Sequence, residues 1–318
     1  MSDKASISNI VKLSIPIFFA NLVIPLVAIV DTGLMGNLDN ASYLTATSIA
    51  TSVFSLIFWS FGFLRMGTTG MVAQAHGSKN YDEIVNLVLR NIAFVIIISL
   101  LLILCQGYIF TIALSIFDLS NETSKYFKEY FEIRIYSSFG ELIIFIITGL
   151  FIGLQRTTVS SVIVGFFSIT NIMLSLLFVI YYDLNVQGVA LGTVISSTLT
   201  AIIFLCYTFL ELKKFTSIKI NLEKIFNLKK IKKLFNINFD IFVRSAFLTF
   251  SFLFFTYLGN TISEDVVAAN TILLNLIMLS AFILDAYAFS TEGIVGYSIG
   301  SKDKKLLTNV IKNSFILS

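Results

Sequence analysis

Residues 12–35 read KLSIPIFFANLVIPLVAIVDTGLM, an apolar run in which Lys12 and Asp31 are the charged residues. A helix needs roughly 20 apolar residues to cross the hydrocarbon core of a bilayer, and this run reaches that length. An acidic side chain inside such a run is costly to keep away from water and usually marks a functional site. The stretch therefore predicts a membrane-spanning helix that carries a working carboxylate at Asp31.

The rest of the chain has the same character. Of its 318 residues, 56% are hydrophobic and 13% are charged, and the mean hydropathy is +0.89. Soluble domains are roughly a quarter charged. A net charge of +3 is too small to indicate a polyanionic partner. This composition excludes a soluble enzyme, a disordered tail and a nucleic-acid binder, and it predicts an all-α polytopic membrane protein.

Long apolar runs recur, with short polar stretches between them. They predict nine spans, near residues 12–35, 44–70, 91–117, 128–154, 158–181, 187–210, 238–259, 266–298 and from about 306 to the end. Lys and Arg gather in the N-terminal segment and in every second loop, most densely at residues 213–233. Because such loops stay in the cytoplasm, we expect a cytoplasmic N-terminus. We expect residues 213–233 to lie on anionic lipid headgroups, or to form a regulatory or partner site.

The chain also contains an internal repeat. Shifting the chain by 223 residues aligns three short motifs from the region of the first two spans with identical residues later in the sequence. Gly36-Asn37 aligns with Gly259-Asn260, Thr68 and Gly70 with Thr291 and Gly293, and Gly77-Ser-Lys79 with Gly300-Ser-Lys302. Both copies start on the cytoplasmic side, so they predict two parallel six-helix repeats, as in transporters whose halves rock around a midplane site.

The repeat predicts the domain organisation. We expect an N-terminal six-helix lobe at residues 1–210, a Lys-rich cytoplasmic linker at 211–237 and part of a C-terminal lobe at 238–318. The last region has room for about two and a half spans, where a full second copy has six. The sequence therefore predicts twelve spans for the full architecture, with the second repeat truncated here.

Pro16 and Pro25 precede Asp31 in the first span, and they are the two prolines of the chain. Each removes a backbone donor and can kink a helix, which frees carbonyl groups for a polar ligand. We therefore expect a gating or structural role for both. A carboxylate held away from water readily takes up a proton or pairs with a cationic substrate. The alternative is that Asp31 caps the helix end near the outer interface.

Polar residues in two later spans are candidates to share a coupling-cation or substrate site with Asp31. Asn171 and Ser175 are four residues apart and lie on one helix face. Thr193 lies in the sixth span, with Gln187 near its start as a secondary candidate. The alternative for such residues is a hydrogen bond to their own backbone or to a neighbouring helix.

Further charged residues fall within spans. Arg65 is expected toward the inner end of the second span, in a structural or gating role or snorkelling to the interface. Asp285 and Glu292 are seven residues apart and near one helix face, so they could form a second cation site in the other lobe. We expect Arg134 near the outer interface and Glu141 deeper in the fourth span.

No motif for covalent or ATP-driven chemistry occurs. The sequence lacks a Walker-type phosphate loop, a His-Glu-x-x-His pair and a nucleophile elbow. We therefore predict a secondary transporter rather than an enzyme, without a cofactor, in which a proton or sodium gradient supplies the energy.

Four segments in the first two spans carry a family resemblance: PLVAIVDT at 25–32, GNLD at 36–39, FLRMGTTG at 63–70 and AQAHG at 73–77. They resemble the multidrug and toxic compound extrusion (MATE) family, in particular its DinF-like branch. The resemblance implies twelve spans in two lobes of a bacterial inner-membrane antiporter, which exchanges protons or sodium for amphipathic, often cationic compounds. It implies that Asp31 takes the coupling cation or meets the substrate, with Asn171 and Thr193 at the polar fifth-span and sixth-span positions.

One departure separates the chain from the family pattern, because Ser175 stands where the family often has a second aspartate. Coupling could then rest on Asp31 alone, shift to Asp285 and Glu292, or be lost. Two other functions stay open: a flippase for lipid-linked oligosaccharide precursors, and a truncated, non-transporting membrane protein. The expected partners are a small organic substrate and membrane lipids, with the chain acting as a monomer.

Overall fold

The computed structural model describes residues 5–38, 40–117, 119–215, 222–262 and 264–317, apart from some side chains of the later helices. These residues form helices without strands: α1 (Ile7–Gly36), α2 (Ala41–Ser60), α3 (Phe63–Gly77), α4 (Tyr81–Leu104), α5 (Gln106–Ile116), α6 (Asn121–Arg134), η2 (Ile135–Ser137), α7 (Ser138–Gly153), α8 (Thr157–Leu176), η3 (Leu177–Tyr181), α9 (Asn185–Lys213), α10 (Leu222–Ile225), α11 (Leu228–Ile262), α12 (Glu264–Gly300) and α13 (Lys304–Leu317). Six helical segments within this part are long and apolar enough to cross a membrane, and they match the first six predicted spans.

Three of the predicted spans are broken helices. The second divides into α2 and α3 at Phe61–Gly62, and the third divides into α4 and α5 at Cys105. In the fourth, one turn of 3₁₀-helix, η2, joins α6 to α7. Side-chain caps start several of the helices, such as Ser6 on α1 and Asn80 on α4, because their oxygen atoms accept a backbone N–H that the helix itself leaves unpaired.

The later predicted spans fall on α11, α12 and α13. The seventh and eighth lie on α11 and α12, which include side chains outside the described set. The ninth, predicted from about residue 306, is the 14-residue α13, which is shorter than a bilayer span. The predicted linker at 211–237 contains the end of α9, α10 and the start of α11, and its residues 216–221 lie outside the described part.

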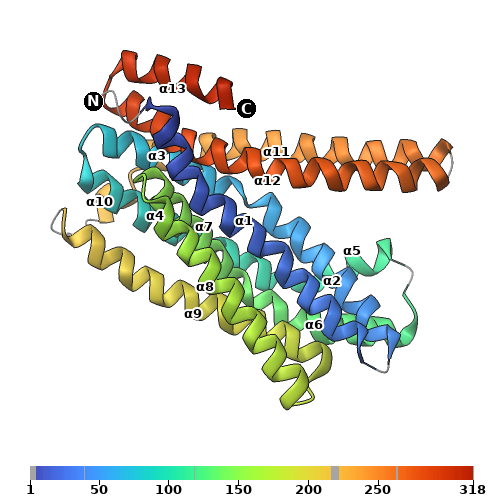
Figure 1. Cartoon of the computed structure of the whole chain (residues 1–318). Helices are drawn as coiled ribbons and strands as arrows, with labels where there is room; N and C mark the ends of the chain where they lie inside the picture. Colours follow the sequence, from blue (N-terminus) through green and yellow to red (C-terminus); the bar gives the residue numbers. More distant parts are fainter. Residues whose placement is uncertain (1–4, 39, 118, 216–221, 263, 318) are drawn as a thin grey trace.

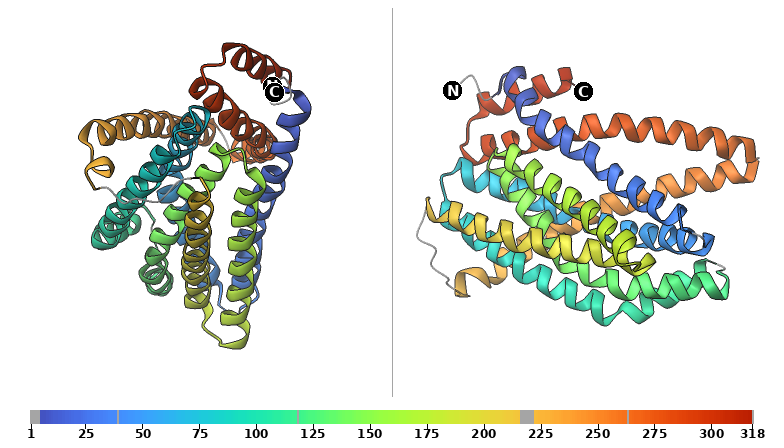
Figure 2. Two further views of the ribbon diagram at one scale, coloured as in Figure 1. Left: turned by 90° about the vertical axis from the view of Figure 1, so that its left-hand side faces the viewer. Right: turned by 60° about the horizontal axis from the view of Figure 1, so that its bottom comes forward.

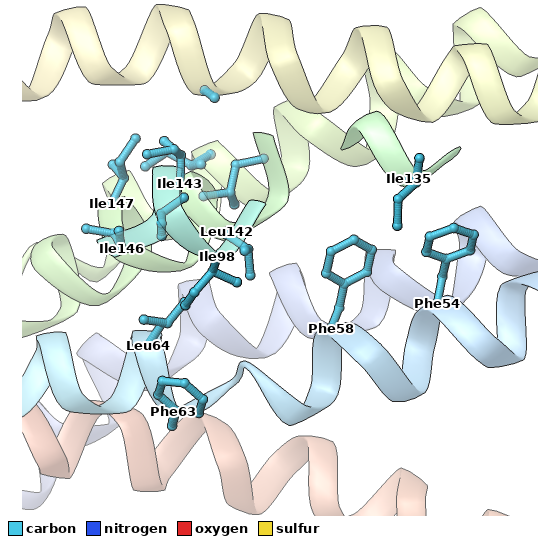
Figure 3. Packing of buried hydrophobic residues seen from close by; sticks show 14 of the residues in the cluster. Phe54, Phe58, Phe63, Leu64, Ile98, Ile135, Leu142, Ile143, Ile146 and Ile147 are labelled. Atoms are coloured by element: carbon cyan, nitrogen blue, oxygen red, sulfur yellow. The ribbon is translucent and has the colours of Figure 1, made fainter. Parts of the chain in front are cut away.

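The core is centred on α7, whose side chains are mostly buried between α3, α4, α8 and α9. Figure 3 shows Phe54 and Phe58 pointing from α2 toward Ile135, beside a second group of packed side chains around Leu142. Lipid tails are as apolar as these residues, so packing contacts, rather than removal from water, hold such helices together. This dense core fixes the helices that carry the cavity described below.

Helices α11 and α12 lie side by side and project beyond the ends of the other helices at one end of the molecule (Figures 1 and 2). At the opposite end α12 packs along α3 and α1, and both termini lie there. The amide of Asn313 on α13 donates a 2.6 Å hydrogen bond to the Ala5 carbonyl, which ties the two ends of the chain together. Among the described residues, α12 and α13 are therefore tied to the N-terminal helices at the end that holds both termini.

The turns after α3 and α12 repeat each other residue by residue. Lys79 and Lys302 both have φ 57°, a left-handed conformation that side chains other than glycine seldom adopt. The backbone bonds match too: the N–H groups of Ser78, Lys79 and Asn80 donate to the carbonyls of Gln74, His76 and Ala75, and those of Ser301, Lys302 and Asp303 donate to Tyr297, Ile299 and Ser298. The agreement follows the offset of the sequence repeat and supports a duplicated unit.

Candidate functional site

A cavity of about 330 Å³ lies among α1, α2, α6, α7, α8 and α9, and side chains from α3 and α12 reach its edge. Most of its wall is apolar, including Ile24, Phe167 and Phe289. Polar side chains also line it: Asn21, Asp31, Thr51, Ser55, Arg65, Tyr130, Arg134, Glu141, Thr148, Ser160, Ser161, Ser168, Asn171 and Thr193. A mostly apolar hollow with a few placed polar groups is typical of a small-molecule site.

Asp31 projects from α1 into this cavity. Its Oδ1 atom is buried and makes no hydrogen bond to any described residue. Burying a carboxylate oxygen without a partner is costly, so the arrangement is suited to a group that takes up a proton, a metal cation or a cationic ligand. The interpretation of Asp31 as a cap at the helix end does not fit, because α1 continues for more than one further turn to Gly36.

Asn171 and Thr193 line the same cavity as Asp31, and Ser175 lies within reach of the Asp31 carboxylate. The amide of Asn171 donates to Thr193 Oγ1 at 2.9 Å and lies 3.4 Å from Ser196 Oγ. Ser175 is fully buried, close enough to Asp31 to interact, and its hydroxyl makes no hydrogen bond of good geometry to the described residues. The Asn171 Oδ1 atom is likewise an open acceptor within the described part. The structure thus brings three of the predicted residues to Asp31.

An ion pair in the cavity wall was not predicted as part of the site. Arg134 Nη1 lies 2.5 Å from Glu141 Oε1, and both side chains are almost buried. The Ser137 hydroxyl bridges them, since it lies 3.0 Å from Glu141 Oε1 and also contacts the Arg134 guanidinium. That guanidinium lies over the rings of Phe54 and Phe58, at 5.2 and 5.3 Å from the centroids. Arg134 was expected near the outer interface; its side chain lies in the cavity wall, almost buried.

Arg65 links the two lobes at the cavity edge. Its guanidinium lies 3.9 Å from the centre of the Phe289 ring on α12, a cation–π contact. Glu292 and Asp285, also on α12, are within electrostatic range of it. Neither carboxylate lines the cavity, and the Asp285 side chain is exposed. The secondary acidic pair therefore surrounds Arg65 and does not share a hollow with Asp31.

The remaining predicted residues lie around the site. Gln187 is exposed at the start of α9, where its amide lies 3.3 Å from Glu129, outside the cavity. Helix α1 runs through both Pro16 and Pro25 without a break. Pro25 has no N–H to donate to the carbonyl of Asn21 one turn earlier, and Asn21 lines the cavity.

Comparison with known proteins agrees with this architecture. A family model, MatE, matches residues 16–177. DNA damage-inducible protein F of Escherichia coli (strain K12) is 32% identical over 249 residues, which cover 78% of this chain and 53% of that protein. Multidrug export protein MepA of Staphylococcus aureus (strain NCTC 8325 / PS 47) is 24% identical over 239 residues, covering 74% of this chain and 52% of that protein.

A solved structure shows the same fold. The crystal structure of MATE in complex with MaD5 superposes with a TM-score of 0.86 at 19% identity, covering 97% of this chain and 70% of that one. The chain spans about half the length of the two curated relatives. The MatE family model covers just over half of the chain and includes the helices that carry Asp31 and Asn171, and so this chain belongs to the MatE family.

Proposed function

We propose that the protein exports amphipathic, cationic organic compounds across the bacterial inner membrane in exchange for protons or sodium. The observation that carries the proposal is the Asp31 carboxylate, which faces an apolar cavity with one oxygen lacking a hydrogen bond to the described residues. Such a group gains most from a cation that enters the cavity. The name of the MepA relative, a multidrug export protein, supports the same function.

Exchange follows if Asp31 holds one cation at a time. When a proton or sodium ion occupies the carboxylate, the negative charge that attracts a cationic compound is neutralised. When the compound occupies it, the coupling ion is displaced. Helix α1 carries Asp31 and packs against both α8 and α12, so a change at Asp31 can reach both lobes. These contacts of α1 with both lobes favour alternating access, in which the lobes rock around the cavity.

The charge balance of the cavity favours a cationic cargo over an anionic one. A flippase for lipid-linked oligosaccharides would need cationic side chains for a pyrophosphate group. Arg134 is neutralised by Glu141, and Arg65 is covered by Phe289 and has acidic neighbours. Asp31 is then the unpaired charge of the cavity among the described side chains. We further propose a monomer with a cytoplasmic N-terminus and no cofactor.

The test is export of ethidium, a planar monovalent organic cation, from energised vesicles that contain the protein as it exists or an Asp31→Asn variant. Asparagine keeps the size of the side chain and removes its charge. We expect export by the wild type and a fall to the background rate in the variant. Equal export by the two proteins would overturn the role of Asp31, and the absence of export from both would overturn the proposed function of this chain.

A further inference from the structure

The cavity wall holds a second carboxylate, Glu141. It is bound to Arg134, the cation within electrostatic range of Asp31. The two acidic groups therefore compete for one guanidinium inside the same hollow. Which of them Arg134 pairs with decides whether Asp31 is available to an incoming cation.

Three contacts hold Arg134 on the Glu141 side. The direct ion pair measures 2.5 Å, and the Ser137 hydroxyl contacts both partners. The Ser137 hydroxyl oxygen also lies 2.8 Å from the Arg134 carbonyl. The rings of Phe54 and Phe58 lie against the guanidinium and favour its cationic form at this place. In this arrangement the Asp31 Oδ1 atom is left without a hydrogen bond to the described residues.

We propose that Glu141 is a positioning residue, which keeps Asp31 available to cations by holding the Arg134 guanidinium away from it. The inference rests on the proposed function, because it assumes that Asp31 binds the cation. Glu141 itself need not touch the coupling ion or the cargo. Without Glu141, a buried and unpaired Arg134 would be costly. Asp31 is the carboxylate it can then pair with in the cavity, and that pair would neutralise the site.

Removing one charge should weaken the binding of ethidium, and removing a second charge should restore it. Glu141→Gln leaves Arg134 free to bind Asp31, so we expect the affinity for ethidium to fall about ten-fold. Arg134→Gln/Glu141→Gln removes the competing cation as well, so its affinity should return to near the wild-type value. Rescue by removal of a second charged group would not follow if Glu141 served packing alone.

Glu211→Gln is the matched control. Glu211 also forms a 2.5 Å ion pair, with Arg156, but neither residue lines the cavity. We expect this variant to bind ethidium as the wild type does. All variants are compared as purified full chains in detergent, by fluorescence titration, with Asp31→Asn measured alongside them.

The outcomes separate the two claims. If Asp31→Asn loses affinity but Glu141→Gln does not, or if the double variant stays as weak as Glu141→Gln, the positioning role of Glu141 is overturned and the proposed function stands. If the wild type fails to bind ethidium, or Asp31→Asn binds it equally well, both claims are overturned.

Discussion

At the scale of single residues, the polar contacts between α8 and α9 show how the site is held. Thr193 accepts a hydrogen bond from Asn171 and donates one to the Val189 carbonyl at 3.1 Å. Its hydroxyl is therefore satisfied twice, which orients the Asn171 side chain beside Asp31. Hydrogen bonds between membrane helices are individually modest, so this contact contributes more to orientation than to stability.

Thr193→Val keeps the shape of the side chain and removes its hydroxyl. We expect a loss of about 0.6–1 kcal/mol in unfolding free energy, because Asn171 then keeps only its longer contact to Ser196. Thermal unfolding in detergent measures the difference. Thr208→Val is the control on the same helix, since Thr208 is buried and its hydroxyl makes no hydrogen bond within the described part. It should be neutral or stabilising, and equal losses in the two variants would count against the assigned contact.

The site residues differ in how far the sequence could predict them. Asp31, Asn171 and Thr193 are polar groups inside long apolar runs, which was enough to make them candidates, and helical spacing placed Asn171 and Ser175 on one face. The pairing of Arg134 with Glu141 was missed because the two were expected at different depths of the fourth span, and the turn of 3₁₀-helix between them was not predicted. The signal that could have found the pair is the presence of two opposite charges in one predicted span, because a charge inside a membrane is costly unless it is paired.

At the scale of elements, the approach of α3 to α12 depends on glycine. A Cβ atom at Gly77 would overlap the Tyr297 carbonyl, and one at Gly300 would overlap the Gln74 carbonyl. The two contacts correspond under the sequence repeat, so each copy presents its glycine to the backbone of the other. Because the opposing atoms belong to the backbone, a larger residue can be accommodated only if the helices move apart.

Gly77→Ala and Gly300→Ala should therefore destabilise the protein by about 1–3 kcal/mol, although alanine is the better helix former. The control is Gly165→Ala on α8, where a Cβ meets no atom within 4 Å. That change should leave stability unchanged or raise it by up to about 1 kcal/mol. Thermal unfolding of the three variants side by side checks this, and a loss at Gly165 as large as at Gly77 would refute the packing argument.

The sequence predicted these elements unevenly. The first six spans could be read from apolar length, and the repeated Gly-Ser-Lys motifs fall on the two matching turns. The breaks within three of the spans were missed, because apolar composition is the same on both sides of Gly62 and Cys105 and reports length rather than continuity.

At the scale of the whole molecule, the cavity lies within the N-terminal helices, and Phe289 of α12 reaches its edge beside Arg65. The tight contact of α3 and α12 lies at the end that holds both termini, and the ends of α11 and α12 away from it project from the bundle (Figure 1). The proposed rocking of the lobes would turn about this end. A ligand that neutralises Asp31 shifts the equilibrium between two arrangements of the lobes only if it binds one arrangement more tightly than the other.

The central claim is that coupling ion and cationic compound compete for Asp31. The direct measurement is the affinity for ethidium at pH 6 and pH 8, with and without sodium, in the wild type and in Asp31→Asn. Protonation removes the negative charge, so a proton-coupled protein should bind ethidium more weakly at pH 6. A sodium-coupled one should bind it more weakly when sodium is added. The account predicts one of these losses in the wild type and neither in the variant, whereas equal wild-type affinity under all conditions would contradict it.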